Sequence, residues 1–128
     1  MTDDGSTIFT PVLTVPLTYT HGRPYSQEPV VRWQAWTGAI DKAFNVDLFT
    51  VYPQPVLSDI EFLEDGDMVL GFFDRFGHQS GDRNYKTYGT ATIRSTIAGD
   101  VLRADAKAAN FTLESNGKVG TNTSAGGV

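Results

Sequence analysis

The sequence predicts an all-β protein whose strands are joined into antiparallel hairpins, forming a β-meander. Along most of the 128 residues, short runs rich in β-branched and aromatic residues alternate with clusters of Gly, Pro, Asn and Asp, the spacing expected of strands and turns. Residues 59–75 read DIEFLEDGDMVLGFFDR, two apolar runs on either side of an acidic turn that contains Gly66. Asn116-Gly117 is a second turn signal, because this dipeptide adopts the positive φ angles of two-residue hairpins.

The length and composition favour one β-rich segment spanning residues 1–128. The chain has 40% hydrophobic and 20% charged residues, with 13 Gly and 6 Pro, a balance typical of turn-rich globular proteins. A formal net charge of −5 argues against a nucleic-acid partner, because phosphate binding needs clustered Lys and Arg. The absence of cysteine excludes disulfides, thiolate catalysis and Cys-ligated zinc.

Neither a membrane span nor a signal peptide is predicted. The sequence has no run of about 18 apolar residues, and the residues TDDGST after Met1 lack the basic region and apolar core of an export signal. The turn residues Asp4-Gly5 have no strand before them, and residues 118–128 have the composition of a flexible tail. We therefore expect a segment of a larger β-structure, with a whole small domain as the alternative.

The first half of the chain predicts short, interrupted strands. Residues 7–19, TIFTPVLTVPLTY, are rich in β-branched residues, and their two prolines confine them to sheet edges or short pieces. Residues 30–36 have the pattern of a half-buried strand, with Trp33 on its apolar face. Residues 39–49 combine helical spacing with strand composition, so at most one turn of helix followed by a strand is expected.

The 59–75 hairpin combines an amphipathic strand with an apolar one. In the first strand, DIEF, the two apolar residues share one face and the two acidic residues lie on the other. The second strand, MVLGFF, is nearly continuously apolar, which predicts that both of its faces are covered. Gly71 within this strand predicts a bulge or a close approach of neighbouring backbone.

The remainder of the chain predicts a polar excursion and a final hairpin. Residues 76–98 are polar, Gly-spaced and Tyr-containing, which favours a long loop or an irregular projecting ribbon. GDVLRAD, residues 99–105, predicts another strand. FTLESNGKVG, residues 111–120, predicts a hairpin that turns at Asn116-Gly117.

These motifs resemble a known group of propeller proteins. Residues 59–75 have the form of the strand, turn and strand unit of NHL-like β-propellers. Residues 53–81, followed by AGDVLRA and FTLESNG, resemble a propeller-like region of large bacterial secreted or cell-surface proteins that often carry SdrD B-type repeats. The resemblance covers most of residues 8–117. It implies about two propeller blades and an extracellular or cell-surface location, and it brings no catalytic residues with it.

Few residues suggest catalysis or metal binding. His78 lies near Asp74 and Asp82 in the sequence, which would suit a mixed histidine and carboxylate metal cluster, but an ordinary loop histidine is favoured. The acidic residues at 64–67 lack the spacing of an EF-hand, so a turn is favoured over a calcium site. The two acids of the DIEF strand suit a solvent-facing strand better than a catalytic pair. No metal, cofactor or catalytic residue is therefore predicted.

Aromatic residues are the main candidates for ligand binding. Trp36, Tyr85 and Tyr88 could stack on sugars or anchor a protein partner, because Trp and Tyr dominate binding hot spots. His78 is a further candidate surface residue. Trp33, in contrast, is expected in the core because it lies on the apolar face of its strand.

We expect a non-enzymatic structural or adhesive module of a secreted bacterial surface protein. Its expected partners are a protein or glycan ligand, the remaining blades of the parent protein, or a second copy paired through open strand edges. Neither a nucleic acid nor insertion into a membrane is expected. Two alternatives stay open: a propeller-type hydrolase or lyase with a carboxylate-lined site, and a self-contained carbohydrate-binding β-sandwich that uses Trp36, Tyr85 and Tyr88.

Overall fold

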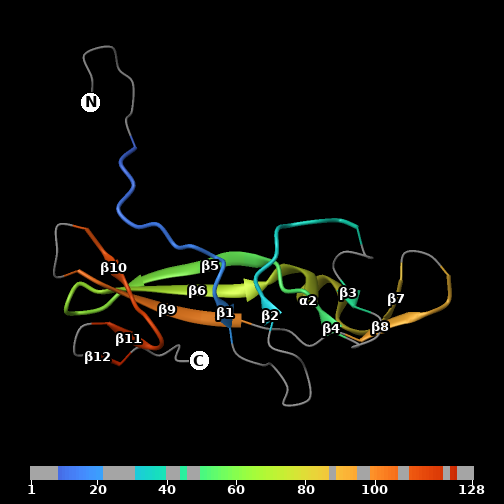
Figure 1. The fold of residues 1–128 in the computed structure, drawn as a ribbon. Helices are drawn as coiled ribbons and strands as arrows, with labels where there is room; N and C mark the ends of the chain where they lie inside the picture. The colour runs from blue at the N-terminus through green and yellow to red at the C-terminus, as the bar shows by residue number, and fades with distance from the viewer. Residues whose placement is uncertain are drawn as a thin grey trace, which may run out of the picture.

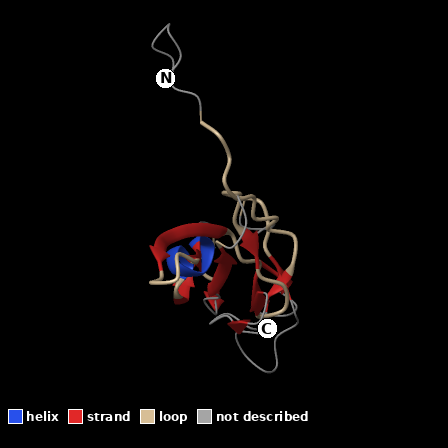
Figure 2. Ribbon diagram, turned by 90° about the vertical axis from the view of Figure 1, so that its left-hand side faces the viewer, coloured by secondary structure: helices blue, strands red, loops and turns tan. Residues whose placement is uncertain are grey.

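Strands predominate among the described residues of the computed structural model, and one short helix lies beside them in this part of the chain (Figure 2). The structure describes residues 9–21, 31–39, 44–45, 50–86, 89–94, 99–106, 110–119 and 122–123. Its elements are β1 (Thr20–His21), β2 (Val31–Arg32), β3 (Phe44–Asn45), β4 (Thr50–Val51), β5 (Pro55–Phe62), β6 (Met68–Asp74), α2 (Arg75–Ser80), β7 (Asp82–Tyr85), β8 (Thr92–Arg94), β9 (Gly99–Asp105), β10 (Thr112–Leu113), β11 (Lys118–Val119) and β12 (Asn122–Thr123). The all-β prediction is confirmed. Within these ranges, no helix has the length and apolarity needed to cross a bilayer.

Four strands form the main sheet, in the order β10-β9-β6-β5. All of their pairings are antiparallel, so the sheet is a meander, interrupted between β6 and β9 by α2, β7 and β8. Figure 1 shows this inserted segment at one end of the sheet and β10 to β12 at the other. The sheet is open, with β5 and β10 as its outer strands. Short two-stranded pairings join β1 to β2, β3 to β4, β7 to β8 and β11 to β12.

The β5–β6 hairpin forms as predicted. In its turn, the Leu63 amide donates to the Asp67 carbonyl over 2.8 Å and the Gly66 amide donates to the Leu63 carbonyl over 2.9 Å. Gly66 has a φ of 87°, a conformation that glycine adopts without steric cost. The turn chemistry read from the sequence therefore has its expected effect.

Gly71 marks the close approach that was predicted for it. β5 bulges between Leu57 and Asp59, and the Ser58 Oγ at this bulge donates to the Gly71 carbonyl over 2.9 Å. A side chain at position 71 would bring its Cβ to 3.2 Å from the Ser58 Oγ. The glycine thus accommodates a bulge on the neighbouring strand.

β6 is covered less evenly than its apolar sequence predicted. Met68, Leu70 and Phe72 are buried on one face, whereas the residues between them are only half-buried. Register with β9 places Leu102 and Ala104 on the same face as these three residues. Full burial is therefore found on this core face alone, and the predicted cover of the other face is only partial.

An extended N-terminal segment covers the core face. The partly buried hydrophobic residues packed against the core are Leu13, Val15, Leu17, Tyr19, Phe111 and Leu113. Side chains at 13, 15, 17 and 19 alternate with exposed ones as in a strand, yet residues 9–19 belong to no strand. The two prolines of this stretch supply no backbone N–H for a ladder. The predicted strand pieces are thus extended chain without sheet pairing.

The strand predicted at residues 30–36 is shorter than expected. Trp33 is buried in the core, as predicted, but β2 ends at Arg32. The Gln34 amide instead donates to the Pro53 carbonyl over 2.8 Å, which carries the chain alongside residues 53–55. Most of residues 39–49 lie outside the described residues, apart from the strand β3.

A buried ion pair holds the turn at 63–67 against β9. Asp67 is buried, and its Oδ2 accepts a hydrogen bond from the Arg103 Nε over 2.7 Å. The same guanidinium donates to the Asp65 Oδ2 over 2.7 Å, and the Ala106 amide donates to the Asp67 Oδ1. The hydrogen bond to Asp67 raises the pKa of Arg103 above its usual range. These acids therefore serve the turn and its anchorage, in agreement with the interpretation of 64–67 as a turn.

Two C-terminal predictions need correction. Residues 76–98 include α2 as well as the β7–β8 ribbon, so a loop or ribbon alone was the wrong expectation for their start. Residues 118–128 were expected to form a flexible tail, but β11 and β12 pair within them. The predicted turn at Asn116-Gly117 is confirmed by φ angles of 55° and 71°. The single bridge between Ser115 and Lys118 closes it, whereas β10 pairs with β9 and β11 with β12 instead of with each other.

Candidate functional site

A pocket of about 290 Å³ lies beside α2 and includes one of the predicted binding residues, Tyr85. We call it the α2 pocket. Its lining residues are Thr37, Gly38, Arg75, Phe76, Gln79, Ser80, Asn84, Tyr85 and Ile93. These come from the segment after β2, from α2 and from the β7–β8 ribbon, which Figure 1 shows together at one end of the main sheet.

Asp74 fixes the start of α2 beneath this pocket. Its side chain is fully buried, and its Oδ1 accepts hydrogen bonds from the Phe76 amide at 3.0 Å and the Gln54 amide at 2.9 Å. The first of these bonds is an N-cap, which satisfies a helix amide that has no partner within the helix. The second ties the chain before β5 to the same carboxylate. Asp74 therefore sets the position of α2 relative to β5.

Gln54 extends this network to the wall of the pocket. It is fully buried, and its Oε1 accepts from the Arg75 Nη1 at 2.8 Å and from the Thr37 amide at 3.1 Å. Its Nε2 donates in turn to the Thr37 carbonyl. A buried amide that is satisfied in this way holds its neighbours in one geometry. The pocket wall is therefore built on a fixed polar network.

Arg75 lines the α2 pocket and also contacts Trp36, which is not itself part of the lining. The Arg75 Cζ lies 5.2 Å from the centre of the Trp36 ring, within the range of a cation–π interaction. The Trp36 Nε1 donates to the Pro55 carbonyl over 2.7 Å, yet 61% of the residue is exposed. The indole is therefore oriented by two contacts while much of its surface stays available.

The start of the β7–β8 ribbon contributes Asn84 and Tyr85 to the pocket lining. The Asn84 Nδ2 donates to the Ser80 carbonyl over 2.7 Å, which ties the ribbon to the end of α2. Arg83 has a φ of 58° at an irregularity in the β7–β8 register. Tyr85 follows and is 74% exposed. The ribbon therefore contributes a largely exposed aromatic side chain to the pocket lining.

The structure places one of the four predicted surface residues in the pocket lining, a second against a lining residue and a third elsewhere. Tyr85 lines the pocket, and Trp36 contacts Arg75 outside the lining. His78 does not line it, and its ring instead packs edge-on against Phe73 at 4.8 Å. Tyr88 lies outside the described residues.

The carboxylates considered for catalysis lie on different faces of the sheet. Asp59 and Glu61 pair with Gly71 and Val69, which alternate along β6 with the buried core-face residues. Asp74 shares the core face. Because neighbouring strand residues point to opposite sides, Asp59 and Glu61 do not converge with Asp74. Among the described side chains, no group of three or more His, Asp or Glu residues is arranged to hold a metal ion.

Sequence reasoning missed the polar residues that build the α2 pocket, including Gln54, Asp74 and Arg75. A signal was present, because Asp74 and Gly81 stand on either side of the six residues of α2, as an N-cap and a C-terminal glycine do. The helix itself, RFGHQS, contains few strong helix formers. Its capping by buried side chains therefore decides its conformation more than its composition does.

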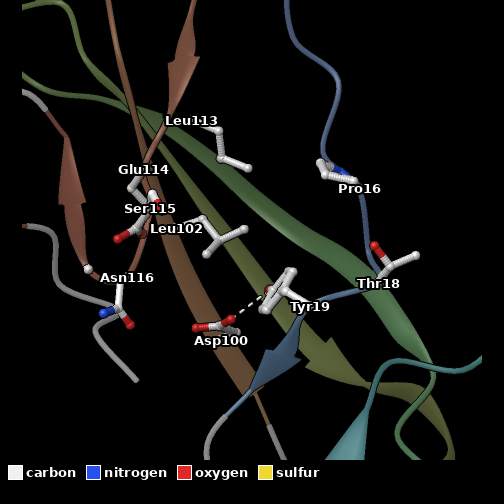
Figure 3. Close-up of a pocket in the computed structure, with 10 residues that line it drawn as sticks. Pro16, Thr18, Tyr19, Asp100, Leu102, Leu113, Glu114, Ser115 and Asn116 are labelled. Carbon is white, nitrogen blue, oxygen red and sulfur yellow. Dashed lines mark hydrogen bonds between the residues drawn. The ribbon is translucent and has the colours of Figure 1, made fainter.

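A second open pocket, of about 440 Å³, lies between the N-terminal segment and the β10–β11 turn (Figure 3). Pro16, Leu102 and Leu113 contribute apolar walls to it. The Tyr19 hydroxyl donates to the Asp100 Oδ2 over 2.6 Å, a distance typical of a charge-assisted bond. Burial of the phenol, followed by this hydrogen bond, raises the pKa of Tyr19. The bond fastens the N-terminal segment to β9.

Comparison with known proteins identifies one curated relative by sequence. Colossin-A from Dictyostelium discoideum is 37% identical over 78 residues, which cover 60% of this chain and 1% of Colossin-A. The chain thus spans a very small part of that relative's length. No protein-family model matches the chain, and no solved structure matches it.

Proposed function

We propose that this chain is a non-enzymatic adhesive module of a secreted or cell-surface protein, and that its α2 pocket binds a glycan. The observation that carries the proposal is the exposed Tyr85 in a lining of polar, planar side chains, together with the exposed Trp36 that contacts Arg75 of that lining. The resemblance of residues 53–81 to secreted surface proteins supports the location. The length of Colossin-A relative to its matched stretch is consistent with a module within a much longer protein.

The chemistry of the α2 pocket suits a sugar ring. Aromatic faces pack against the C–H faces of sugars, while amide and guanidinium groups hydrogen-bond to hydroxyls. Gln79 and Asn84 supply amides to the lining, and Arg75 supplies a guanidinium. A volume of about 290 Å³ lies near the lower end of the roughly 300–1,000 Å³ of small-molecule sites. It therefore fits one terminal sugar residue better than a long oligosaccharide.

A glycan panel with tryptophan fluorescence as the readout tests this proposal. We expect a bound glycan to shift the emission of the chain, and Trp36→Phe to remove the shift, because the other tryptophan, Trp33, is buried. Tyr85→Ala should weaken binding about tenfold, the loss that corresponds to a hot-spot contact of about 1.4 kcal/mol. Phe9→Ala is the matched control, since Phe9 is an exposed aromatic residue outside the pocket.

Two outcomes would contradict the glycan proposal. One is a panel in which no glycan shifts the emission. The other is equal binding by the Tyr85→Ala and Phe9→Ala variants, which would place the contact outside the α2 pocket.

We further propose that the main sheet is one blade of a propeller-like structure. Its four strands follow one another in space as they do in sequence, with the β7–β8 ribbon as an insertion, which is the arrangement of a propeller blade. An experimental structure of the longer protein tests this. Four-stranded sheets repeated around an axis are expected, whereas two sheets packed face to face as a sandwich would contradict it.

A further inference from the structure

The outer strand β5 exposes a row of apolar side chains. Leu57, Ile60 and Phe62 pair with Phe72, Leu70 and Met68, so they belong to the core face of the sheet. Their partners on β6 are buried, yet the exposed fractions of Leu57, Ile60 and Phe62 are 46%, 46% and 61%. Apolar surface that remains exposed on an outer strand favours association with another chain.

The other face of β5 is acidic. Asp59 and Glu61 are both exposed there. Glu61 pairs with Val69, which pairs in turn with Arg103, but that guanidinium is already bonded to Asp65 and Asp67. The outer strand therefore presents apolar side chains on one face and negative charge on the other.

We propose that the outer edge of β5 binds a partner strand in which apolar and basic residues alternate. β5 is the last strand of its sheet, so its outward backbone groups can pair with an added strand. The apolar residues of the partner extend the core face over Ile60 and Phe62. Its Lys or Arg residues lie beside Asp59 and Glu61, where opposite charges stabilise a cross-strand pair. The proposal does not depend on the α2 pocket.

Only part of the outer edge of β5 is available for pairing with a partner strand. The Trp36 Nε1 already donates to the Pro55 carbonyl, so the start of β5 is occupied. Residues 56–62 remain, and the bulge at Ser58 divides them. Within them, the Ile60 amide donates to the Asp59 Oδ1 over 2.9 Å, an exposed contact that a partner strand would have to replace at Ile60. The longest regular stretch for pairing is therefore residues 59–62, which contains both acids together with Ile60 and Phe62.

A second copy of this chain is a poor occupant because of charge. An antiparallel pairing of two β5 strands centred on Ile60 places Asp59 of each copy opposite Glu61 of the other. A pairing centred on Glu61 places that residue opposite itself. Like charges directly opposite one another destabilise a sheet, so the edge discriminates against self-pairing and in favour of a basic strand.

Binding of synthetic peptides to the 128-residue chain tests the proposal. The first probe is a fluorescein-labelled, eight-residue peptide in which valine and lysine alternate. The second carries glutamate in place of lysine, and the third has the composition of the first with its lysines grouped together. We expect fluorescence anisotropy to show binding of the alternating lysine peptide, and at least tenfold weaker binding of the other two.

Charge-changing variants locate the interaction. Asp59→Lys should weaken binding of the lysine peptide several-fold, and the double variant Asp59→Lys/Glu61→Lys should prefer the glutamate peptide. Asp82→Lys makes the same charge change at an exposed acid of β7 and should leave binding unchanged. The single variants keep the test decisive if the double variant fails to fold, which a thermal melt reveals.

Several results would overturn the assignment. Equal binding of the alternating and grouped lysine peptides would indicate general attraction to an acidic chain. Equal losses in Asp59→Lys and Asp82→Lys would place the contact away from β5. Failure of the lysine peptide to bind, or sedimentation of the native chain as a dimer that excludes the peptide, would also reject a basic strand as the occupant.

Discussion

β5 and β6 are two strands of one hairpin with different surroundings. Leu70 on β6 and Ile60 on β5 pair directly, yet their exposed fractions are 3% and 46%. β6 lies between β5 and β9, and the N-terminal segment with Trp33 covers its core face. β5 has one neighbouring strand in the main sheet. The comparison teaches that alternation assigns a residue to a face, whereas neighbouring elements decide whether that face is buried.

The largest expected effect on stability comes from replacing a leucine by alanine on each of the two strands. Leu70→Ala should lower the free energy of unfolding by about 3 kcal/mol, because it leaves a cavity in the core. Leu57→Ala makes the same chemical change on β5 and should cost less than about 1 kcal/mol, since the residue is half exposed. Urea unfolding measures both values. Equal losses would mean that β5 is as well covered as β6.

A smaller loss is expected at Asp74, where the buried side of the hairpin meets α2. Asp74→Ala removes the acceptor of the Gln54 and Phe76 amides and should cost about 2–3 kcal/mol. Asp74→Asn keeps an oxygen acceptor and should recover part of this loss. Asp82→Ala, at an exposed acid, is the control and should change the unfolding free energy by less than about 0.5 kcal/mol. An unchanged free energy of unfolding in Asp74→Ala would show that α2 does not depend on this cap.

The turn at Asn116-Gly117, which the single Ser115–Lys118 bridge closes, extends the comparison to a second turn. Gly117→Ala should cost about 1 kcal/mol, because alanine is disfavoured at a φ of 71°. Gly38→Ala is the control, since an added Cβ at that position meets no atom within 4 Å. Thermal unfolding of both variants measures the difference. A Gly117→Ala chain as stable as the control would mean that this turn contributes little to the stability of the fold.

The smallest effect on stability at neutral pH is expected at Tyr19. Its hydrogen bond to Asp100 holds the N-terminal segment that covers the core face of β6. The folded chain favours the protonated phenol, because burial and the Asp100 hydrogen bond raise the pKa of Tyr19 above its ordinary value of 10.0. This contribution to stability is complete below pH 10 and is lost as the pH rises above it. Urea midpoints measured from pH 8 to 11 should therefore fall more steeply for the native chain than for Tyr19→Phe. Parallel curves would contradict the assignment.

Local sequence signals predicted those features of the fold that depend on only a few neighbouring residues. The turn at Gly66, the turn at Asn116-Gly117 and the close approach at Gly71 all follow from the conformational freedom of Gly and Asn. Trp33 was placed in the core by its position on the apolar face of a short strand pattern. The helix α2 was missed because its caps and its buried contacts outweigh a weak helical composition.

The candidate site was predicted only in part. The exposure of Tyr85 follows from its polar surroundings in the sequence, whereas the α2 pocket that it lines depends on Gln54 and Asp74. These two residues lie 20 positions apart, and no local pattern indicates that they meet. His78 was expected at the same surface, but its contact with Phe73 keeps it out of the pocket lining.

By itself, the sequence determined the all-β class, the β5–β6 hairpin and the residues that share each strand face, because turn chemistry and alternation are local properties. Only the tertiary structure decided that one face of β6 is buried while β5 remains exposed, and that Gln54, Asp74 and Arg75 meet beside Trp36. The physical reason is that burial and buried hydrogen bonds depend on segments far apart in the chain, whose contacts form only when the whole sheet is assembled.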